Sequence, residues 1–425
     1  MPDKKSCLLW GLLIVCVAVF GGLELWKARG GSQGAAAGSP LEPKAIVTTF
    51  KTDAATSRAI TWQTKDSQAA SVVQWVKGGK ADVTFEGKDV TAVKGTTDTV
   101  RNGSGEKQGV HKANITGLEP DTEYTYRVGS GESGGWSDPA VFRTAPADAD
   151  EVTFLDVADS QGETEEDFAV WGQTLDKAFE LFGDARFIVH NGDLTEQPED
   201  AGAWDAFFGK AQAWLGRIPL MPVTGNHDEI DKNADAFVQH FNVPDNGAEG
   251  SIPGTTYSFD YGPVHIAVMN TESNVKAQAE WLRADLRGTN KEWLIVALHR
   301  GPYGGNQDEA IVKRWVPVFD EFGVDLVLQG HNHEYSRSYP LKGDAIVQPG
   351  EGTVYVVPNT AGPKLNKKKE DRFYHQVHFQ NERQMFAGIR IQGDTLTYRA
   401  YDIDGRKLDE FELKHSGDKR RKPAE

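Results

Sequence analysis

Short runs of alternating apolar and polar residues, separated by turn-forming residues, occupy the chain from Ile46 to Thr144. Residues 59–62, Ala-Ile-Thr-Trp, are one example of the two-residue period that places one face of a strand in a core. No segment with the 3.6-residue period of a helix interrupts these runs. We therefore predict an all-β sandwich domain over residues 46–146, with Trp62 and Trp75 in its core.

After Asp150 the pattern changes to apolar runs that alternate with loops and amphipathic helices. The apolar runs expected to form strands are residues 152–158, 186–190, 218–223, 293–298 and 324–328. The helical stretches between them are residues 168–182, 203–215, 277–286 and 309–322. Alternation of this kind predicts an α/β domain with buried strands.

Further strands complete this second domain, which we expect to span residues 151–414. Residues 257–261 and 265–269 flank Gly262-Pro263 and are expected to form an inserted hairpin. Beyond Gly352 the helical pattern stops. The strands expected there, completing a second sheet, are residues 353–357, 386–391, 395–401 and 411–414. Residues 415–425 are expected to form a polar tail.

The N-terminal residues form an apolar segment, because residues 6–23 carry no charge. This stretch is longer than the ~7–15 residue core of a signal peptide and slightly shorter than the ~20 residues that span a bilayer. We expect residues 1–29 to be a signal peptide or membrane anchor and residues 30–45 to be a linker. The pattern favours an exported protein. We expect its N-terminal segment to anchor it to the membrane at the cell surface.

Charge and cysteine content exclude several function classes. Lys and Arg total 46 and Asp and Glu total 62, so the formal charge is −16 and no broad nucleic-acid surface is expected. The two cysteines, Cys7 and Cys16, lie in the N-terminal apolar segment. The predicted domains therefore have no thiol for a disulfide, a zinc–thiolate site or a cysteine nucleophile.

Polar clusters follow five of the predicted strands. They are Asp159-Ser160-Gln161, Gly192-Asp193, Gly225-Asn226-His227-Asp228, His299 and Gly330-His331-Asn332-His333. Ligand sites in α/β folds gather at the carboxyl ends of strands, so we expect these clusters to converge on one crevice. Each cluster alone is typical of a helix cap, a turn or a packed core histidine, whereas the five together favour a ligand site. An extended segment over residues 331–333 would put both imidazoles on one side.

The donor types in these clusters indicate which metals the crevice suits. Carboxylate, amide and imidazole groups are present and thiolates are absent from this set. Such mixed oxygen and nitrogen donors suit Mn²⁺, Fe or Zn²⁺ better than Ca²⁺, which prefers oxygen ligands alone. The sequence therefore predicts a transition-metal site.

The motif set resembles that of the calcineurin-like metallophosphoesterases. The contexts Leu298-His299-Arg300-Gly301-Pro302-Tyr303 and His333-Glu334-Tyr335-Ser336-Arg337, with the β-sandwich before them, are similar to the purple acid phosphatase branch. Residues 118–128 resemble the tyrosine-corner region of fibronectin type III-like domains. The resemblance extends from about Ile46 to Lys414. It implies two packed β-sheets flanked by helices and a centre of two metal ions.

The resemblance also implies a role for each motif residue. Asp159 and His333 would bind the first metal, Asn226, His299 and His331 the second, and Asp193 would bridge the two. A metal-bound hydroxide would attack phosphorus, and His227 would protonate the leaving group or stabilise the charged transition state. Asp228 would orient a histidine or be a solvated loop carboxylate.

Two positions depart from the purple acid phosphatase pattern. Glu196 stands where that branch has the tyrosine whose phenolate on Fe³⁺ gives the purple colour. We therefore expect no purple colour and leave the metal pair open among Fe, Mn and Zn. An exposed loop carboxylate is the expected state of Glu196, with metal coordination as the alternative. Gln161 stands where many metallophosphoesterases have a ligand histidine; its amide oxygen would coordinate weakly or cap the following helix.

Several residues outside the motifs are candidates for the rim of the site. Arg300, Tyr303, Tyr335 and Arg337 flank predicted ligands and are candidates to line its mouth. The cluster of Lys364, Lys367, Lys368, Lys369 and Arg372 would meet a phosphorylated substrate or form a solvated basic loop. His375 and His378 are expected on the surface or the rim.

The leading hypothesis is an exported metal-dependent phosphomonoesterase acting on a phosphorylated small molecule or another phosphoester. A phosphodiesterase or nucleotidase on the same metals is the alternative. A third hypothesis is a surface binding protein with an inactive second domain. Neither the oligomeric state nor the metal pair follows from the sequence.

Overall fold

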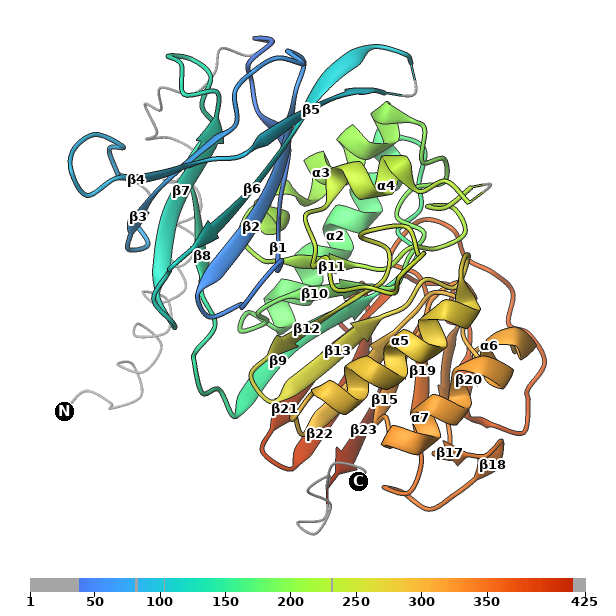
Figure 1. The fold of residues 1–425 in the computed structure, drawn as a ribbon. Coiled ribbons are helices and arrows are strands. Elements are labelled where there is room, and N and C mark those ends of the chain that lie inside the picture. Colours follow the sequence, from blue (N-terminus) through green and yellow to red (C-terminus); the bar gives the residue numbers. More distant parts are fainter. Residues whose placement is uncertain (1–37, 81–82, 103, 231, 416–425) are drawn as a thin grey trace, which may run out of the picture.

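The computed structural model describes residues 38–80, 83–102, 104–230 and 232–415 (Figure 1). The predicted signal or anchor at residues 1–29 lies outside the described residues, as do residues 30–37 of the linker and residues 416–425 of the tail. Within the described ranges, no helix is both long and apolar enough to cross a membrane.

The N-terminal region is a sandwich of two four-stranded antiparallel sheets, as the alternating pattern predicts. One sheet has the order β1 (Lys44–Thr49), β2 (Ser57–Thr64), β6 (Lys107–Thr116) and β5 (Thr96–Arg101). The other has the order β4 (Thr91–Lys94), β3 (Val72–Lys77), β7 (Glu123–Gly129) and β8 (Ala140–Arg143). Trp62 is fully buried in its core and Trp75 packs against it. The Tyr124 hydroxyl accepts a hydrogen bond from Glu119 N at 2.9 Å, which is the contact expected of a tyrosine corner.

The second region holds two large sheets (Figure 1). The six-stranded sheet has the order β11 (Leu220–Pro222), β10 (Ile188–His190), β9 (Glu151–Val157), β21 (Met385–Gln392), β22 (Thr395–Asp402) and β23 (Lys407–Lys414). The seven-stranded sheet has the order β12 (Tyr257–Tyr261), β13 (Val264–Val268), β14 (Trp293–Ala297), β15 (Leu326–Leu328), β19 (Val354–Pro358), β16 (Tyr335–Ser338) and β20 (His375–Phe379). β17 (Leu341–Lys342) and β18 (Ala345–Ile346) form a separate two-stranded hairpin.

Alternate residues of the central strands serve two different cores. Ile266 and Ile295 belong to the large core that also contains Phe154 and Phe187 of the six-stranded sheet side. Their neighbours Ala267 and Val296 belong instead to a second core with the helices. Both faces of these strands are therefore buried, which explains their continuous apolar sequence.

Helices cover the outer faces of the two sheets (Figure 1). On one side they are α2 (Glu165–Leu181), α3 (Ala201–Leu215) and the short α4 (Asp235–His240). On the other side they are α5 (Val275–Gly288), α6 (Glu309–Arg314) and α7 (Val316–Phe322). The fold class predicted from the sequence, an α/β sandwich of two sheets behind an all-β domain, is confirmed.

Two details of the prediction are wrong. Residues 353–357 were expected beside the C-terminal strands, but β19 pairs with β15 and β16 in the other sheet. Residues 309–322 were expected as one helix, but the helix is interrupted at Trp315. Pro317 explains this break, because it has no N–H to donate and its ring collides with the carbonyl four residues earlier.

The sandwich is joined to the second region mainly through α3 and the segment after it. Gln212 exchanges two hydrogen bonds with the Ile46 backbone, at 3.1 and 2.9 Å. Tyr126 donates its hydroxyl to Gly216 O at 2.5 Å, and Asn242 Nδ2 donates to Ala113 O at 3.1 Å. These are directional contacts between partly or fully buried groups, so the two regions pack in one defined arrangement.

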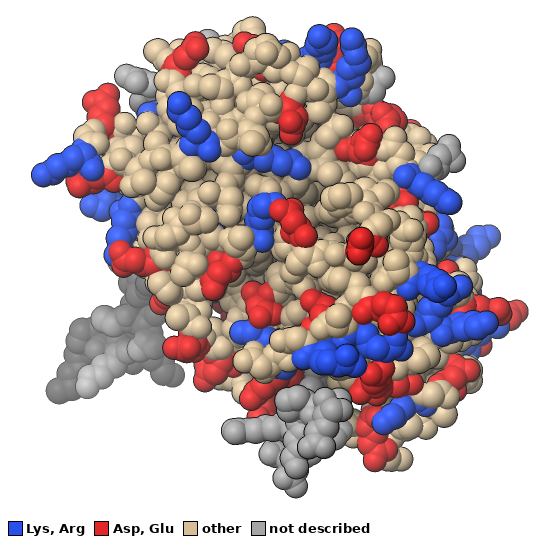
Figure 2. Space-filling model, viewed as in Figure 1, with Lys and Arg blue, Asp and Glu red and all other residues tan. Residues whose placement is uncertain are grey.

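Charged side chains of both signs are interspersed on the face that Figure 2 shows. Several form ion pairs between elements, such as Arg283 of α5 with Glu321 of α7 at 2.8 Å. Exposed pairs of this kind contribute little to stability.

A buried histidine ties the hairpin of β12 and β13 to α5. His265 Nδ1 lies 2.7 Å from Asp260 Oδ1, and His265 Nε2 lies 2.8 Å from Asp285 Oδ2. Burial alone would lower the pKa of His265, but the hydrogen bonds to Asp260 and Asp285 raise it to about 9. Both ring nitrogens therefore donate, and the ring is charged at neutral pH.

This arrangement predicts a pH-dependent term in stability. Because the folded-state pKa of His265 exceeds the unfolded value of about 6.5, the stabilisation is complete below pH 6.5 and is lost as pH rises through 9. Between pH 6 and 10, the unfolding free energy should fall by roughly 3 kcal/mol more in the wild type than in His265→Gln. Urea unfolding of both proteins measures this difference; parallel pH profiles would contradict the assignment.

Candidate metal centre

The five polar clusters lie together where strands of the two sheets end. Asp159 follows β9, Asp193 follows β10 and Asn226 follows β11, while His299 and His331 follow β14 and β15 of the other sheet. Backbone hydrogen bonds join the loops, including Asp159 N to Gly192 O and Gly330 N to His299 O, both at 3.0 Å. The predicted convergence on one place is therefore observed.

Two glycines allow these loops to approach so closely. A Cβ atom on Gly225 would collide with the Asp193 carboxylate and backbone. A Cβ atom on Gly330 would collide with the Asn191 carbonyl. Both positions therefore require glycine for packing reasons.

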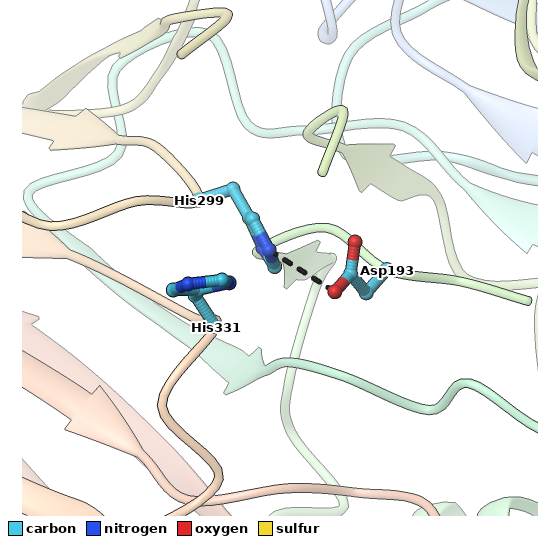
Figure 3. Close-up of side chains that lie close together, drawn as sticks. All are labelled: Asp193, His299 and His331. Atoms are coloured by element: carbon cyan, nitrogen blue, oxygen red, sulfur yellow. Dashed lines mark ion pairs between the residues drawn. The ribbon is translucent and has the colours of Figure 1, made fainter. Parts of the chain in front are cut away.

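The clustered side chains form two groups that share Asp193. One group is Asp193, His299 and His331, which Figure 3 shows, and the other is Asp159, Asp193 and His333. Within each group, one donor atom per residue lies within 4.8 Å of the others. His299 Nε2 lies 3.1 Å from Asp193 Oδ2 and 3.2 Å from Asn226 Oδ1. His333 Nε2 lies 3.3 Å from Asp159 Oδ1.

The backbone of the His331–His333 segment is not extended, so the geometry expected for it is wrong. His331 and His333 both have positive φ, at 74° and 50°. This left-handed backbone conformation is unfavourable for residues other than glycine. In it, the two imidazole rings belong to different groups of the site. Asp159 and Asp193 also have positive φ, at 54° and 53°.

Backbone carbonyls orient two of the imidazoles. His299 Nδ1 donates to Asn191 O and His333 Nδ1 donates to Lys364 O, each at 2.7 Å. The Nε2 atoms of both rings then face the carboxylates. Partners of this kind fix the tautomer that a metal-binding histidine needs.

The carboxylates and rings shift each other's protonation. Burial would raise the pKa of Asp193, but the charge of His299 lowers it well below its usual range. Burial would lower the pKa of His299, but Asp193 and then Asp159 raise it to about 10. Burial, with the charges of His299 and Arg300, lowers the pKa of His331 to about 3, so this ring is neutral.

The donor set fits a pair of metal ions. Two buried carboxylates, three imidazole nitrogens and the Asn226 amide oxygen converge, and no thiolate is among them. A further oxygen, Gln161 Oε1, is buried and has no hydrogen-bond partner. Buried carboxylates require positive charge nearby, and cations of the Mn, Fe or Zn type would supply it.

Asp228 holds the loops of the site and does not orient a histidine. Its side chain is fully buried, so it is not a solvated loop carboxylate either. It accepts hydrogen bonds from the backbone N–H groups of Asp193, Gly225 and Leu194 at 2.7, 2.8 and 3.0 Å. The role of Asp228 is therefore to fix the two loops that carry Asp193 and Asn226.

His227 lies at the open side of the two groups. Its backbone N–H donates to Asp193 Oδ1 at 2.8 Å, and its Nδ1 donates to Glu196 O at 2.9 Å. The side chain is 24% exposed, whereas that of His299 is completely buried. Nε2 is thus the ring nitrogen left to meet a bound molecule.

Gln161 and Glu196 contact each other beside His227. Gln161 Nε2 donates to Glu196 Oε2 at 2.5 Å, and Lys364 Nζ lies 3.3 Å from the same oxygen. Glu196 is therefore not an exposed loop carboxylate, because its side chain is 25% exposed and paired. Gln161 does not cap α2 either, since Thr164 and Asp167 form the capping box of that helix.

Three of the four residues predicted to line the mouth of the site are buried. Tyr335 and Arg337 both donate to Asp409, and the Tyr303 hydroxyl donates to Asp344, so these three have structural partners. Arg300 does reach the site, where its Nη1 lies 2.9 Å from His331 Nε2.

His375 and His378 form a third cluster with Asp371 rather than an exposed rim. His378 Nδ1 lies 2.8 Å from Asp371 Oδ1, and its side chain is almost fully buried. Both nitrogens of His375 already bond the backbone, one to Arg372 N and one to Gly304 O, each at 3.0 Å. The cluster therefore ties its segment to the loop after β14.

Two residues that the sequence did not indicate contact residues of the site. The Asn191 carbonyl orients His299, and Glu272 holds Arg300 with two oxygens at 2.9 and 3.2 Å. Both follow strands, β10 and β13, so the rule that located the ligands also applies to them.

Two family descriptions match the chain. Residues 43–144 match "Purple acid Phosphatase, N-terminal domain" and residues 155–335 match "Calcineurin-like phosphoesterase". Among solved structures, a purple acid phosphatase from yellow lupin (Lupinus luteus) seeds aligns with a TM-score of 0.74. The alignment covers 88% of this chain and 74% of the lupin chain at 19% identity, so it establishes the fold alone.

Curated relatives are similar at about a quarter of positions. An uncharacterized protein of Mycobacterium tuberculosis is 27% identical over 337 residues, covering 69% of this chain and 62% of that protein. Human acid phosphatase type 7 is 27% identical over 60% of this chain and 64% of its own length. A protein of Arabidopsis thaliana named probable inactive purple acid phosphatase 1 is 24% identical over 70% of this chain and 56% of its own length. The chain thus spans about three fifths of the length of these relatives.

Proposed function

Since the chain belongs to the calcineurin-like phosphoesterases, in the purple acid phosphatase branch, we propose that it hydrolyses phosphate monoesters at a centre of two metal ions. The observation that carries the proposal is the buried Asp193 carboxylate shared by two separate histidine groups. Asp159 and His333 would hold one ion, and Asn226, His299 and His331 the other. Ions at this place would polarise the phosphoryl oxygens and activate water for attack on phosphorus.

The chain's own residues supply orientation and a proton. Asp228 fixes the loops of Asp193 and Asn226, and backbone carbonyls fix the His299 and His333 rings. His227 donates Nδ1–H to Glu196 O, so in the doubly protonated ring Nε2 would carry the proton that the leaving oxygen takes.

The complete residue set favours activity over a binding role with an inactive domain. All six predicted ligand positions carry donor side chains, and His227 lies beside them. A purely structural domain does not need so many convergent buried donors. One Arabidopsis thaliana relative is named a probable inactive purple acid phosphatase, so the activity of this chain is to be tested by experiment.

The metal pair belongs to this proposal as well. With Glu196 in place of a tyrosine, we propose a centre without the purple colour that uses Mn, Zn or Fe without a phenolate ligand. We also propose export and attachment at the cell surface, for which the support is the uncharged stretch at residues 6–23.

Substrate preference is tested on the full chain, purified without chelator and supplied with Mn²⁺, Fe²⁺ or Zn²⁺. We expect an aryl phosphate monoester to be hydrolysed faster than the matching diester, because the monoester presents one more negatively charged oxygen to the two ions. Preference for the diester would move the assignment to a phosphodiesterase or nucleotidase. No turnover with any of the metals would contradict the enzyme proposal.

The proton-donor role of His227 predicts a dependence on the leaving group. His227→Ala should reduce turnover of an alkyl phosphate by about 10²–10⁴-fold and that of a nitrophenyl phosphate much less, because an alkoxide needs a proton to depart. Metal content should stay at the wild-type level, since His227 is not a predicted ligand. Equal losses on the two substrates, or full activity on the alkyl phosphate, would contradict this role.

A further inference from the structure

Asp156 is a fully buried carboxylate near the end of the apolar strand β9. Its neighbours Leu155 and Val157 both belong to the large core. Its two hydrogen-bond donors are uncharged: Asn191 Nδ2 lies 2.6 Å from Oδ1, and the Tyr398 hydroxyl lies 2.9 Å from Oδ2. Burial raises the pKa of Asp156 to about 7, and these two hydrogen bonds lower it only in part. An apolar side chain would be more stable at this position, so the needs of the core do not explain a carboxylate here.

The hydrogen bond from Asn191 connects this carboxylate to the metal centre. Asn191 follows β10, and its backbone carbonyl accepts the Nδ1–H of His299 at 2.7 Å. Its backbone N–H donates to Val157 O at 2.8 Å. Its side chain is buried and donates to Asp156, while Oδ1 has no hydrogen-bond partner among the described residues. Asp156 therefore fixes the side chain of the residue whose carbonyl orients His299.

The surrounding loops leave the Asn191 carbonyl and the His299 ring little room. A Cβ atom on Gly192 would lie 2.6 Å from His299 Nδ1, and one on Gly330 would collide with Asn191 O. At the other edge of the ring, His299 Nε2 lies 3.1 Å from Asp193 Oδ2. A displacement of the Asn191 backbone would therefore move the His299 ring relative to Asp193.

We propose that Asp156 is a positioning residue for the metal ion that His299 would bind, and that it acts through the Asn191 side chain. The inference rests on the proposed function. Loss of a hydrogen-bonded partner behind a metal-binding histidine typically weakens metal affinity by about 10–100-fold. The other ion depends less on Asp156, because the Lys364 carbonyl orients the His333 ring instead.

Titration calorimetry of the full chain with Mn²⁺ tests the proposal at pH 8, where Asp156 is ionised. Asp156→Val removes the acceptor of Asn191 Nδ2, so we expect one of the two Mn²⁺ affinities to weaken by about 10–100-fold and the other much less. Asn191→Ala removes the same hydrogen bond from its other end and should give the same selective loss, even if Asp156→Val does not fold. In the double variant the two losses should not add, because both substitutions break one contact.

Two further variants separate positioning from stability. Asp156→Asn keeps an oxygen that can accept from Asn191 Nδ2, so it should hold both Mn²⁺ affinities within about threefold of the wild type. Tyr398→Phe is the matched control, because it removes a hydrogen bond from the same carboxylate and leaves Asn191 in contact with it. Both affinities of this control should stay within about twofold of the wild type.

The outcomes distinguish this inference from the proposed function. Wild-type Mn²⁺ affinities in Asn191→Ala, or equal weakening at both ions, would overturn this inference and leave the two-metal centre standing. A loss in Tyr398→Phe as large as that in Asp156→Val would also overturn it, because the effect would then come from a disturbed core. A wild-type protein that binds no Mn²⁺, Fe²⁺ or Zn²⁺ would overturn the proposed function, and this inference with it.

Discussion

A buried carboxylate surrounded by imidazoles is the constraint on which the site depends. Asp193 is 1% exposed and lies 3.1 Å from His299 Nε2, and it is shared with the group of Asp159 and His333. A carboxylate taken out of water at this depth needs positive charge nearby. Protonated His299 supplies it in the structure as described, and metal ions would supply it in the proposed enzyme.

The rest of the second region serves to hold this arrangement. Its ligands come from strand ends of both sheets, so the packing of one sheet on the other is required before the site exists. Four residues of the site adopt left-handed backbone, and the three N–H groups bound to Asp228 are among the contacts that stabilise the strained loops. Because each loop is held by contacts with another loop, a substitution in one loop would displace several ligand residues.

The sequence was a good guide to strands and strand ends, and a poor one to loop conformation. The apolar runs predicted the buried parallel strands, and the polar residues after them predicted which side chains would meet. The left-handed turns at His331 and His333 carry no periodic signal, so an extended segment was expected instead. The roles predicted for Asp228, Tyr335 and Arg337 were wrong for a related reason. Asp228 binds the backbone of a distant loop, and Tyr335 and Arg337 bind the distant Asp409. Sheet membership of β19 was missed because pairing between remote strands leaves no local pattern.

The central claim is that Asp193 joins two metal ions, and anomalous X-ray diffraction from crystals grown with Mn²⁺ tests it most directly. We expect two peaks, one in contact with Asp159 and His333 and the other with Asn226, His299 and His331, with an oxygen of Asp193 in contact with both. A single peak, or peaks that do not touch Asp193, would contradict it.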